Sequence, residues 1–319
     1  MDREIEKLFI NTDFDNNTSI NYYLTNNIKK KNYFDNLQDI IDDIKFKNDK
    51  KIILDEKNYI INVLEGIFIL NAKLPQNVYI IGINKDLSFL ELKDNNKLNL
   101  ISNNIICNVS IICNNINHNL PLIHIDYDYI DDELYMYENL NIKEQSDIKF
   151  YNVNFIVDYI GNSIFNTNKC KIIFENSYFN IKHFDKLNKN NSLFNFDSGS
   201  VIEFNNCLFE LNITNLLFNL ILSNISINNT KILLSSYSNK YLINNLFSSI
   251  DITNTSVRNN NNNNFINFDY DEELEKNLNA NNIIFHDNKI TINNFISKNF
   301  INKLQGIWYK KYKYIFKNK

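Results

Sequence analysis

The segment Ile148-Lys-Phe150-Tyr-Asn152 shows the pattern on which the fold depends. It has apolar residues at its first and third positions and an asparagine at its fifth, and a further apolar residue, Phe155, follows three positions later. The same arrangement returns about every 23–30 residues, in segments that begin at Ile172, Ile202, Ile225 and Ile250. Such a period is typical of a solenoid, in which each coil buries its apolar side chains only by stacking on its neighbours.

The repeat predicts strands. Alternate residues of a strand face opposite sides, so the first and third positions point the same way. Neither the 3.6-residue spacing of helical repeats nor the leucine pattern of leucine-rich repeats occurs. The asparagine follows the strand at a bend, where it tolerates left-handed backbone angles and can bond to its copies in the adjacent coils. We therefore predict an all-β protein, a single-stranded parallel β-helix of about eight to ten coils with an asparagine ladder.

Capping helices are expected at both ends of this solenoid. Apolar residues at helical spacing predict an amphipathic helix from about Asp35, its expected N-cap, to Phe46. Strands are expected next, over 51–54, 59–63, 67–70 and 78–81. Helical spacing returns between Phe295 and Leu304, after an insertion at 269–278 and a looser sixth repeat that begins at Ile283.

These boundaries divide the chain into three parts. We predict an N-terminal arm over residues 1–34, the β-helix with its capping helices over 35–305, and a basic, aromatic C-terminal tail over 306–319. The tail could contact nucleic acid or an anionic surface, or form a final strand whose charges discourage end-to-end aggregation.

Composition excludes several classes of protein. Asparagine is abundant, whereas only five glycines and two prolines occur; nucleotide bias in an AT-rich genome, such as that of a large DNA virus, explains both. The net charge of −4 predicts no general attraction to nucleic acid or to an anionic membrane. No apolar stretch is long enough to span a membrane. The N-terminus does not resemble a signal peptide, so we expect the host cytoplasm or a virion if the chain is viral.

The cysteines and histidines give no metal or redox motif. Cys107, Cys113, Cys170 and Cys207 show neither a CxxC pair nor metal-ligand spacing with the four histidines. We expect reduced, partly buried thiols, no metal site and no cofactor.

Residues 36–44, a predicted helix, and the following strand-like run 51–60 resemble the start of right-handed parallel β-helices of the pectin-lyase-like superfamily. In those proteins an amphipathic helix plugs the first coil, and the later repeats resemble their coils. The resemblance covers roughly residues 35–305. It implies the fold, and its enzymes cut polysaccharides, but the fold hosts many functions. The polygalacturonase-like motifs cannot be transferred: Asn-Thr-Asp occurs only at 11–13, outside the coils, and His-Gly is missing.

Three residues are weak catalytic candidates. Glu175 and Glu203 lie on adjacent repeats and are expected to point outward, close enough for the paired carboxylates of glycoside hydrolysis. Arg258, just past a repeat strand, could serve as the base of a lyase. Exposed charges that keep a solenoid soluble are the alternative for all three.

A lateral loop is the candidate binding site. The acidic and aromatic stretch from Asp126 to Tyr137 interrupts the repeat, and tyrosine offers a large contact area with a polar tip. The expected contact residues are Tyr127, Tyr129, Asp131, Asp132, Tyr135 and Tyr137. A partly ordered insertion that packs on its own coil is the alternative.

These observations favour a non-enzymatic structural or surface-binding protein, such as a virion or host-interaction component, because no catalytic constellation is apparent. Its partners would be glycans or other structural proteins, and homo-oligomers are compatible with the fold. The alternative is a polysaccharide lyase or glycoside hydrolase that acts on a lateral groove of the β-helix.

Overall fold

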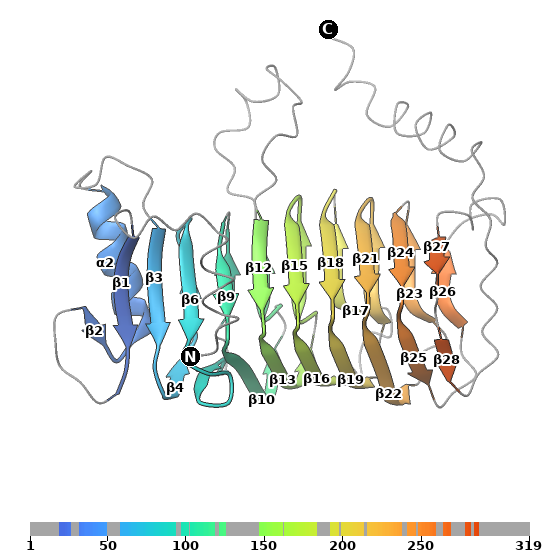
Figure 1. The fold of residues 1–319 in the computed structure, drawn as a ribbon, viewed down its shortest axis with the longest axis horizontal. Helices are drawn as coiled ribbons and strands as arrows, with labels where there is room; N and C mark the ends of the chain where they lie inside the picture. Colours follow the sequence, from blue (N-terminus) through green and yellow to red (C-terminus); the bar gives the residue numbers. More distant parts are fainter. Residues whose placement is uncertain are drawn as a thin grey trace, which may run out of the picture.

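The structure is a computed structural model. Its chain winds around one axis, and the strands of successive coils form three long parallel sheets along that axis (Figure 1). It describes residues 19–286 except for gaps at 27–31, 50–57, 94–96, 102, 119–120, 126–146, 162, 184–191, 198, 214–215, 238–240, 247, 260–263, 269–277 and 282–283. The expected strand at 51–54, the expected C-terminal helix and the C-terminal tail lie outside these described residues. The six expected binding residues between Tyr127 and Tyr137 also lie outside them.

Sheet A has eleven strands, which are, in spatial order, β2 (Tyr33–Phe34), β1 (Ser19–Leu24), β3 (Asn58–Val63), β6 (Val78–Gly82), β9 (Ile105–Cys107), β12 (Asp147–Tyr151), β15 (Lys171–Glu175), β18 (Val201–Asn205), β21 (Asn224–Asn228), β24 (Ser249–Thr253) and β27 (Leu278–Asn281). Sheet B has nine: β4 (Gly66–Ile69), β7 (Ser88–Glu91), β10 (Ser110–His118), β13 (Asn154–Gly161), β16 (Tyr178–His183), β19 (Leu208–Ile213), β22 (Lys231–Tyr237), β25 (Ser256–Asn259) and β28 (Ile284–His286). Sheet C has eight: β5 (Ala72–Lys73), β8 (Leu98–Leu100), β11 (Ile123–Ile125), β14 (Phe165–Asn168), β17 (Ser192–Asp197), β20 (Leu216–Ile221), β23 (Tyr241–Leu246) and β26 (Asn264–Phe268).

From β3 to β26, each coil contributes one strand to each sheet, in the order A, B, C. Each strand pairs in parallel with the equivalent strand of the next coil: β12 with β15, β13 with β16 and β14 with β17. Equivalent repeat positions are therefore direct partners, as in the pairs Ile148↔Ile172 and Phe150↔Phe174. The prediction of an all-β parallel β-helix is confirmed.

Phenylalanine columns fill the interior of the middle coils. The rings of Phe150, Phe174 and Phe204 stack with centroid distances of 4.9 and 4.7 Å. Phe155, Phe179 and Phe209 form a second column on sheet B at 4.7 and 4.4 Å. Rings of the two columns meet edge to face, as Phe174 and Phe179 do at 5.4 Å. Both arrangements are favourable for aromatic quadrupoles, so identical residues in register produce a dense core.

The bend between sheets A and B holds the expected asparagines. Their φ angles are all positive, between 48° and 54°, at Asn152, Asn176, Asn206, Asn229 and Asn254, and Asn108 in the preceding coil, which the repeat did not predict, adopts the same conformation at 57°. Asn152 Nδ2 donates to Asn108 Oδ1 over 2.8 Å, and Asn229 Nδ2 donates to Asn206 Oδ1. The ladder changes partner at one point, because Asn206 Nδ2 donates to Glu175 Oε1 over 2.7 Å. An acidic side chain from the sheet thus enters the row of amides.

Small hydroxyl side chains form a column directly after these asparagines. Ser177 and Thr230 each donate to the carbonyl two residues earlier, over 3.1 and 2.9 Å. Cys207 occupies the same position, and its thiol donates to the Asn205 carbonyl over 3.3 Å. Burial is the largest cause that raises the pKa of Cys207 to about 12. The four cysteines are buried and free, and Cys207 replaces a hydroxyl of this column.

Helix α2 (Leu37–Asp49) closes the N-terminal end of the solenoid (Figure 1). Its apolar stripe is fully buried and consists of Leu37, Ile40, Ile41 and Ile44. The N-cap differs from the expected Asp35: Asn36 Oδ1 accepts a hydrogen bond from the backbone N–H of Gln38 over 2.9 Å. Asn36 is one residue closer to the helix, and its side chain therefore reaches an unpaired N–H of the first turn.

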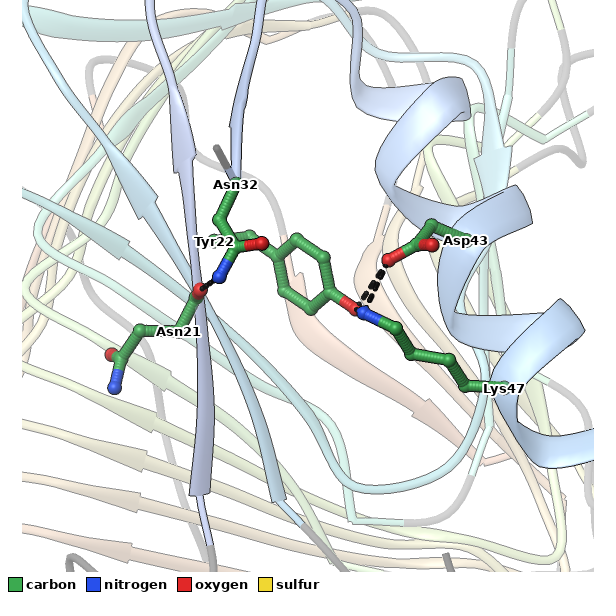
Figure 2. A network of polar contacts seen from close by, with 5 residues as sticks. All are labelled: Asn21, Tyr22, Asn32, Asp43 and Lys47. Atoms are coloured by element: carbon green, nitrogen blue, oxygen red, sulfur yellow. Dashed lines mark hydrogen bonds and ion pairs between the residues drawn. The ribbon is translucent and has the colours of Figure 1, made fainter. Parts of the chain in front are cut away.

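A buried tyrosine joins the cap to sheet A (Figure 2). Tyr22 Oη donates to Asp43 Oδ2 over 2.7 Å, and Lys47 Nζ donates to the same two oxygens over 2.8 and 2.6 Å. Lys47 Nζ also lies 4.9 Å from the centroid of the Tyr22 ring. Burial would raise the pKa of Asp43, but the hydrogen bonds from Lys47 and Tyr22 and the charge of Lys47 lower it overall.

Two parts of the predicted organisation are placed differently. β1 and β2 fall inside the expected arm over 1–34, where they extend sheet A beyond β3. The sixth repeat begins at Leu278, not at Ile283: Leu278 pairs with Ile250 in sheet A, and Phe285 pairs with Val257 in sheet B. Ala280 stands where the other repeats have Ile or Phe. This small residue hides the repeat in the sequence.

Candidate functional site

The outer face of sheet A carries the candidate carboxylates. Ile172 and Phe174 on β15, and Ile202 and Phe204 on β18, are buried in the core. Because neighbouring residues of a strand alternate between faces, Glu175 and Glu203 point to the outside, where both are partly exposed. The pair therefore shares one face on adjacent strands, as the sequence predicts.

Register sets the distance between the two carboxylates. Glu175 pairs with Asn205, and Glu203 lies two residues before Asn205 on the same strand. One strand spacing and two residues along the strand separate the two positions by about 8 Å. Carboxylates of inverting glycosidases are about 6.5–9.5 Å apart, whereas retaining enzymes place them at about 5–5.5 Å. The backbone thus allows the wider geometry.

Lys171 pairs with Glu203. Its Nζ lies 3.2 Å from Glu203 Oε1, across the diagonal between β15 and β18. The two side chains are 31% and 32% exposed, so the ion pair is open to solvent and contributes little to stability. A second, looser pair joins Lys149 Nζ and Asp147 Oδ2 on β12 over 3.8 Å. Both lysines place a positive charge beside the acidic residues of this face.

Glu175 lies between an amide and a tyrosine. It accepts the hydrogen bond from Asn206 described above, and its strand partner on β12 is Tyr151. Burial, and then the negative charges of Glu175, Asp147 and Glu203, raise the pKa of Tyr151. The Tyr151 hydroxyl therefore stays protonated and can donate a hydrogen bond throughout the neutral range.

The structure does not bring Arg258 to this site. Arg258 lies on β25 of sheet B, where it pairs with Leu233 and His286. Glu175 and Glu203 lie in sheet A. The arginine base of a lyase and the carboxylate pair therefore belong to different sheets.

Sequence analysis missed several neighbours of the carboxylates. Tyr151 and Lys171 contribute to the same face, and Asp251 lies in the row of Glu203, two strands away through Ser226. Asp251 Oδ1 is buried and has no hydrogen-bond partner. Aligning the repeats by their asparagines and comparing the positions before, between and after the two apolar residues would have found all three, because those positions form rows across the sheet.

A second amide ladder, which sequence analysis did not predict, runs along sheet C. Asn195 Nδ2 donates to Asn166 Oδ1 over 3.2 Å, and Asn219 Nδ2 donates to Asn195 Oδ1 over 2.7 Å. Asn244 Nδ2 continues the row with a 2.9 Å bond to Asn219 Oδ1. These side chains alternate with buried neighbours such as Phe194 and Phe218, so they face outward. Asn195 and Asn219 each donate one hydrogen bond and accept one within the row.

Within the described ranges, no group of three or more His, Cys, Asp or Glu side chains lies close enough to hold a metal ion. In the same part of the chain, no helix has the length and apolarity that crossing a membrane requires.

No protein-family model and no curated protein matches the chain. Solved structures with a similar path of the chain are pectin methylesterases. The enzyme from carrot is 10% identical with a TM-score of 0.47, over 72% of this chain and 75% of its own. Pectin methylesterase PemA from Erwinia chrysanthemi is 9% identical with a TM-score of 0.49, and a pectin methylesterase in complex with a hexasaccharide is 9% identical with a TM-score of 0.46. Both alignments cover 93% of this chain and 97% of the other.

These neighbours correct one prediction. A non-enzymatic structural or surface-binding protein was favoured from the sequence, whereas the similar solved structures are named as enzymes. At this identity the likeness concerns the fold alone. The chemistry of this chain therefore has to be argued from its own residues.

Proposed function

We propose that this protein is a carbohydrate-active enzyme that hydrolyses glycosidic bonds on the outer face of sheet A. The observation that carries the proposal is that Glu175 and Glu203 face the same side of adjacent strands, with their backbone positions about 8 Å apart. The lyase alternative has less support, because Arg258 lies in sheet B.

The environments of the two carboxylates suggest their roles. Lys171 stabilises the negative charge of Glu203, so Glu203 is the base that takes a proton from a water molecule. Glu175 contacts the neutral amide of Asn206 and lies beside Tyr151, and it is the acid that protonates the leaving oxygen. The bond from the anomeric carbon to that oxygen breaks as the water oxygen attacks from the opposite side. The reaction inverts the anomeric configuration and leaves Glu175 ionised and Glu203 protonated.

The charges of this face favour a neutral glycan. Glu175, Glu203, Asp147 and Asp251 would repel a polyuronide chain, and the lysines offset only part of that charge. Next to the pair the face continues with two amides, Asn205 and Asn228, and two hydroxyls, Ser226 and Thr253. Such groups hydrogen-bond sugar hydroxyls without requiring a charge on the ligand.

The test is incubation with neutral polysaccharides and polyuronides, followed by analysis of new reducing ends. The rate at which new reducing ends form from a neutral glycan is expected to fall by about 10²–10⁴-fold in the Glu175→Gln and Glu203→Gln variants. Glu210→Gln is the matched control, because Glu210 is an exposed carboxylate on sheet B. Proton NMR of the first product should show inversion. No cleavage by the wild-type protein, or full activity in both variants, would overturn the proposal.

A further inference from the structure

The two sides of Glu175 have different surroundings. Its strand partner on the β12 side is Tyr151. The Tyr151 side chain packs against an outer apolar cluster of sheet A, which consists of Tyr79, Ile81 and Cys107. These three side chains alternate with core residues along β6 and β9, so they lie on the outer face of the sheet. The β12 side of Glu175 is therefore mainly apolar.

On the β18 side, Glu175 contacts a turn asparagine. Asn206 Nδ2 donates to Glu175 Oε1 over 2.7 Å. The other turn bonds described above join asparagines of equivalent turns, as Asn152 is joined to Asn108 and Asn229 to Asn206. Asn206 instead donates to the carboxylate that precedes the turn of the adjacent coil. The ladder therefore leaves its row at a carboxylate of the candidate site.

Both partners of this bond are fixed. Asn206 Oδ1 accepts a hydrogen bond from Asn229, so the nitrogen of the Asn206 amide has to face Glu175. The backbone N–H of Asn206 also donates to the Asn228 carbonyl over 3.1 Å. The Glu175 carbonyl accepts from the backbone N–H of Asn152 over 2.9 Å. The contact with Asn206 then holds the end of a side chain whose backbone is already fixed.

The two carboxylates are held in a reciprocal way. Lys171, on the strand of Glu175, forms the ion pair with Glu203. Asn206, which directly follows the strand of Glu203, donates to Glu175. Each carboxylate is thus held by a group from the strand or turn of the other. Together the two contacts restrict how far the carboxylates can move relative to each other.

We infer that Asn206 is a positioning residue for Glu175, an inference that rests on the proposed hydrolysis. Because Asn206 donates to Oε1, the acid proton of Glu175 belongs on Oε2. When that proton moves to the leaving oxygen, negative charge spreads over both carboxylate oxygens. The hydrogen bond from Asn206 then has a charged acceptor and becomes stronger. A contact that strengthens as the reaction proceeds accelerates the chemical step.

The test compares two substrates of one sugar, the neutral glycan and its dinitrophenyl glycoside. Asn206→Gly keeps the turn, because glycine tolerates the φ of 54°, but it removes the amide. With the glycan, kcat should fall by up to about 10²-fold, and KM should change little. The dinitrophenyl group leaves without a proton, so its release should be nearly unchanged. Asn254→Gly is the matched control at the equivalent turn two coils away, and both rates should stay at the wild-type value.

A kinetic cycle shows whether Asn206 acts through Glu175. Adding Asn206→Gly to the Glu175→Gln variant should cause no further loss with the glycan, because the group that Asn206 positions no longer carries a proton. Equal losses with both substrates in Asn206→Gly would indicate a general disturbance and overturn the inference. Independent, multiplicative losses in the cycle would overturn it as well.

Melting temperatures separate this inference from the proposed function. Glu175→Ala and Asn206→Gly remove the same hydrogen bond, so the fall in Tm of the double variant should be smaller than the sum by about 1–3 °C. Additive shifts would overturn the inference even if the wild-type protein cleaves a glycan. If the shifts are not additive but no glycan is cleaved, the proposed function is wrong, and the positioning role of Asn206 is wrong with it.

Discussion

The N-terminal coils and the middle coils of this solenoid are stabilised in different ways. Between β12 and β20, phenylalanine rings of successive coils stack on one another, and turn asparagines and small side chains recur at the following bends up to β24. Between β1 and β10, the core is mainly aliphatic, a helix closes the end, and an apolar cluster forms on the outside. Where the repeat is regular, each residue is stabilised by its own copy. Where it is irregular, the coils depend on contacts that occur once.

The largest effect is expected from the aromatic column. Phe174→Ala should lower the free energy of unfolding by about 3–5 kcal/mol, because Phe174 stacks on both Phe150 and Phe204. Urea denaturation followed by circular dichroism measures the change. The matched variant is Phe150→Ala, which has a stacked phenylalanine on one side only and should cost less. Equal losses would contradict stacking as the source of stability.

A smaller loss of stability should distinguish the outer apolar cluster of sheet A from the partly exposed face around β15. Ile81→Asn should cost about 1.5–3 kcal/mol, since Ile81 is buried in the outer cluster. Ile173→Asn changes the same residue type at an outward, only partly buried position of β15. It should cost less than about 1 kcal/mol. Urea unfolding of the pair checks this. Similar losses would mean that the two halves of the face do not differ in burial.

The turn ladder is expected to contribute about 1–2 kcal/mol for each asparagine. Asn206 has a φ of 54°, so Asn206→Ala forces an unfavourable left-handed backbone on alanine. It also removes the bonds with Glu175 and Asn229. Asn206→Gly loses the same bonds but tolerates the angle and should retain more stability. Thermal unfolding of both variants separates the backbone contribution from the amide contribution, and identical melting temperatures would exclude the backbone part.

The smallest effect concerns the cap and depends on pH. The pKa of Asp43 is lowered in the folded protein, so its contribution is present above the unfolded value of about 4 and is lost as the pH falls through the folded value. Asp43→Asn should therefore lower the melting temperature at pH 7, and the difference from wild type should shrink in acid. Asp42→Asn is the control, because Asp42 is exposed on the same helix. A difference that persists at pH 2 would refute the linkage.

Much of the middle solenoid was predictable from sequence, because its repeats can be aligned with one another. The spacing of Ile148, Phe150 and Asn152 predicts the strand, the direction of its side chains and the left-handed turn that follows it. The outward position of Glu175 and Glu203 follows from the same alternation. The sixth repeat was misplaced because Ala280 breaks the pattern.

The sequence by itself determined the β-helix, its turn ladder and the helix at its N-terminal end, because these depend on periodicity and on local backbone preferences. Only the tertiary structure decided that Lys171 meets Glu203, that Tyr151 lies beside Glu175, and that Arg258 belongs to another sheet. It alone distinguished the buried outer cluster from the exposed part of the same face. Such contacts depend on which coils become neighbours and on what covers them, and residues far apart in the chain settle both.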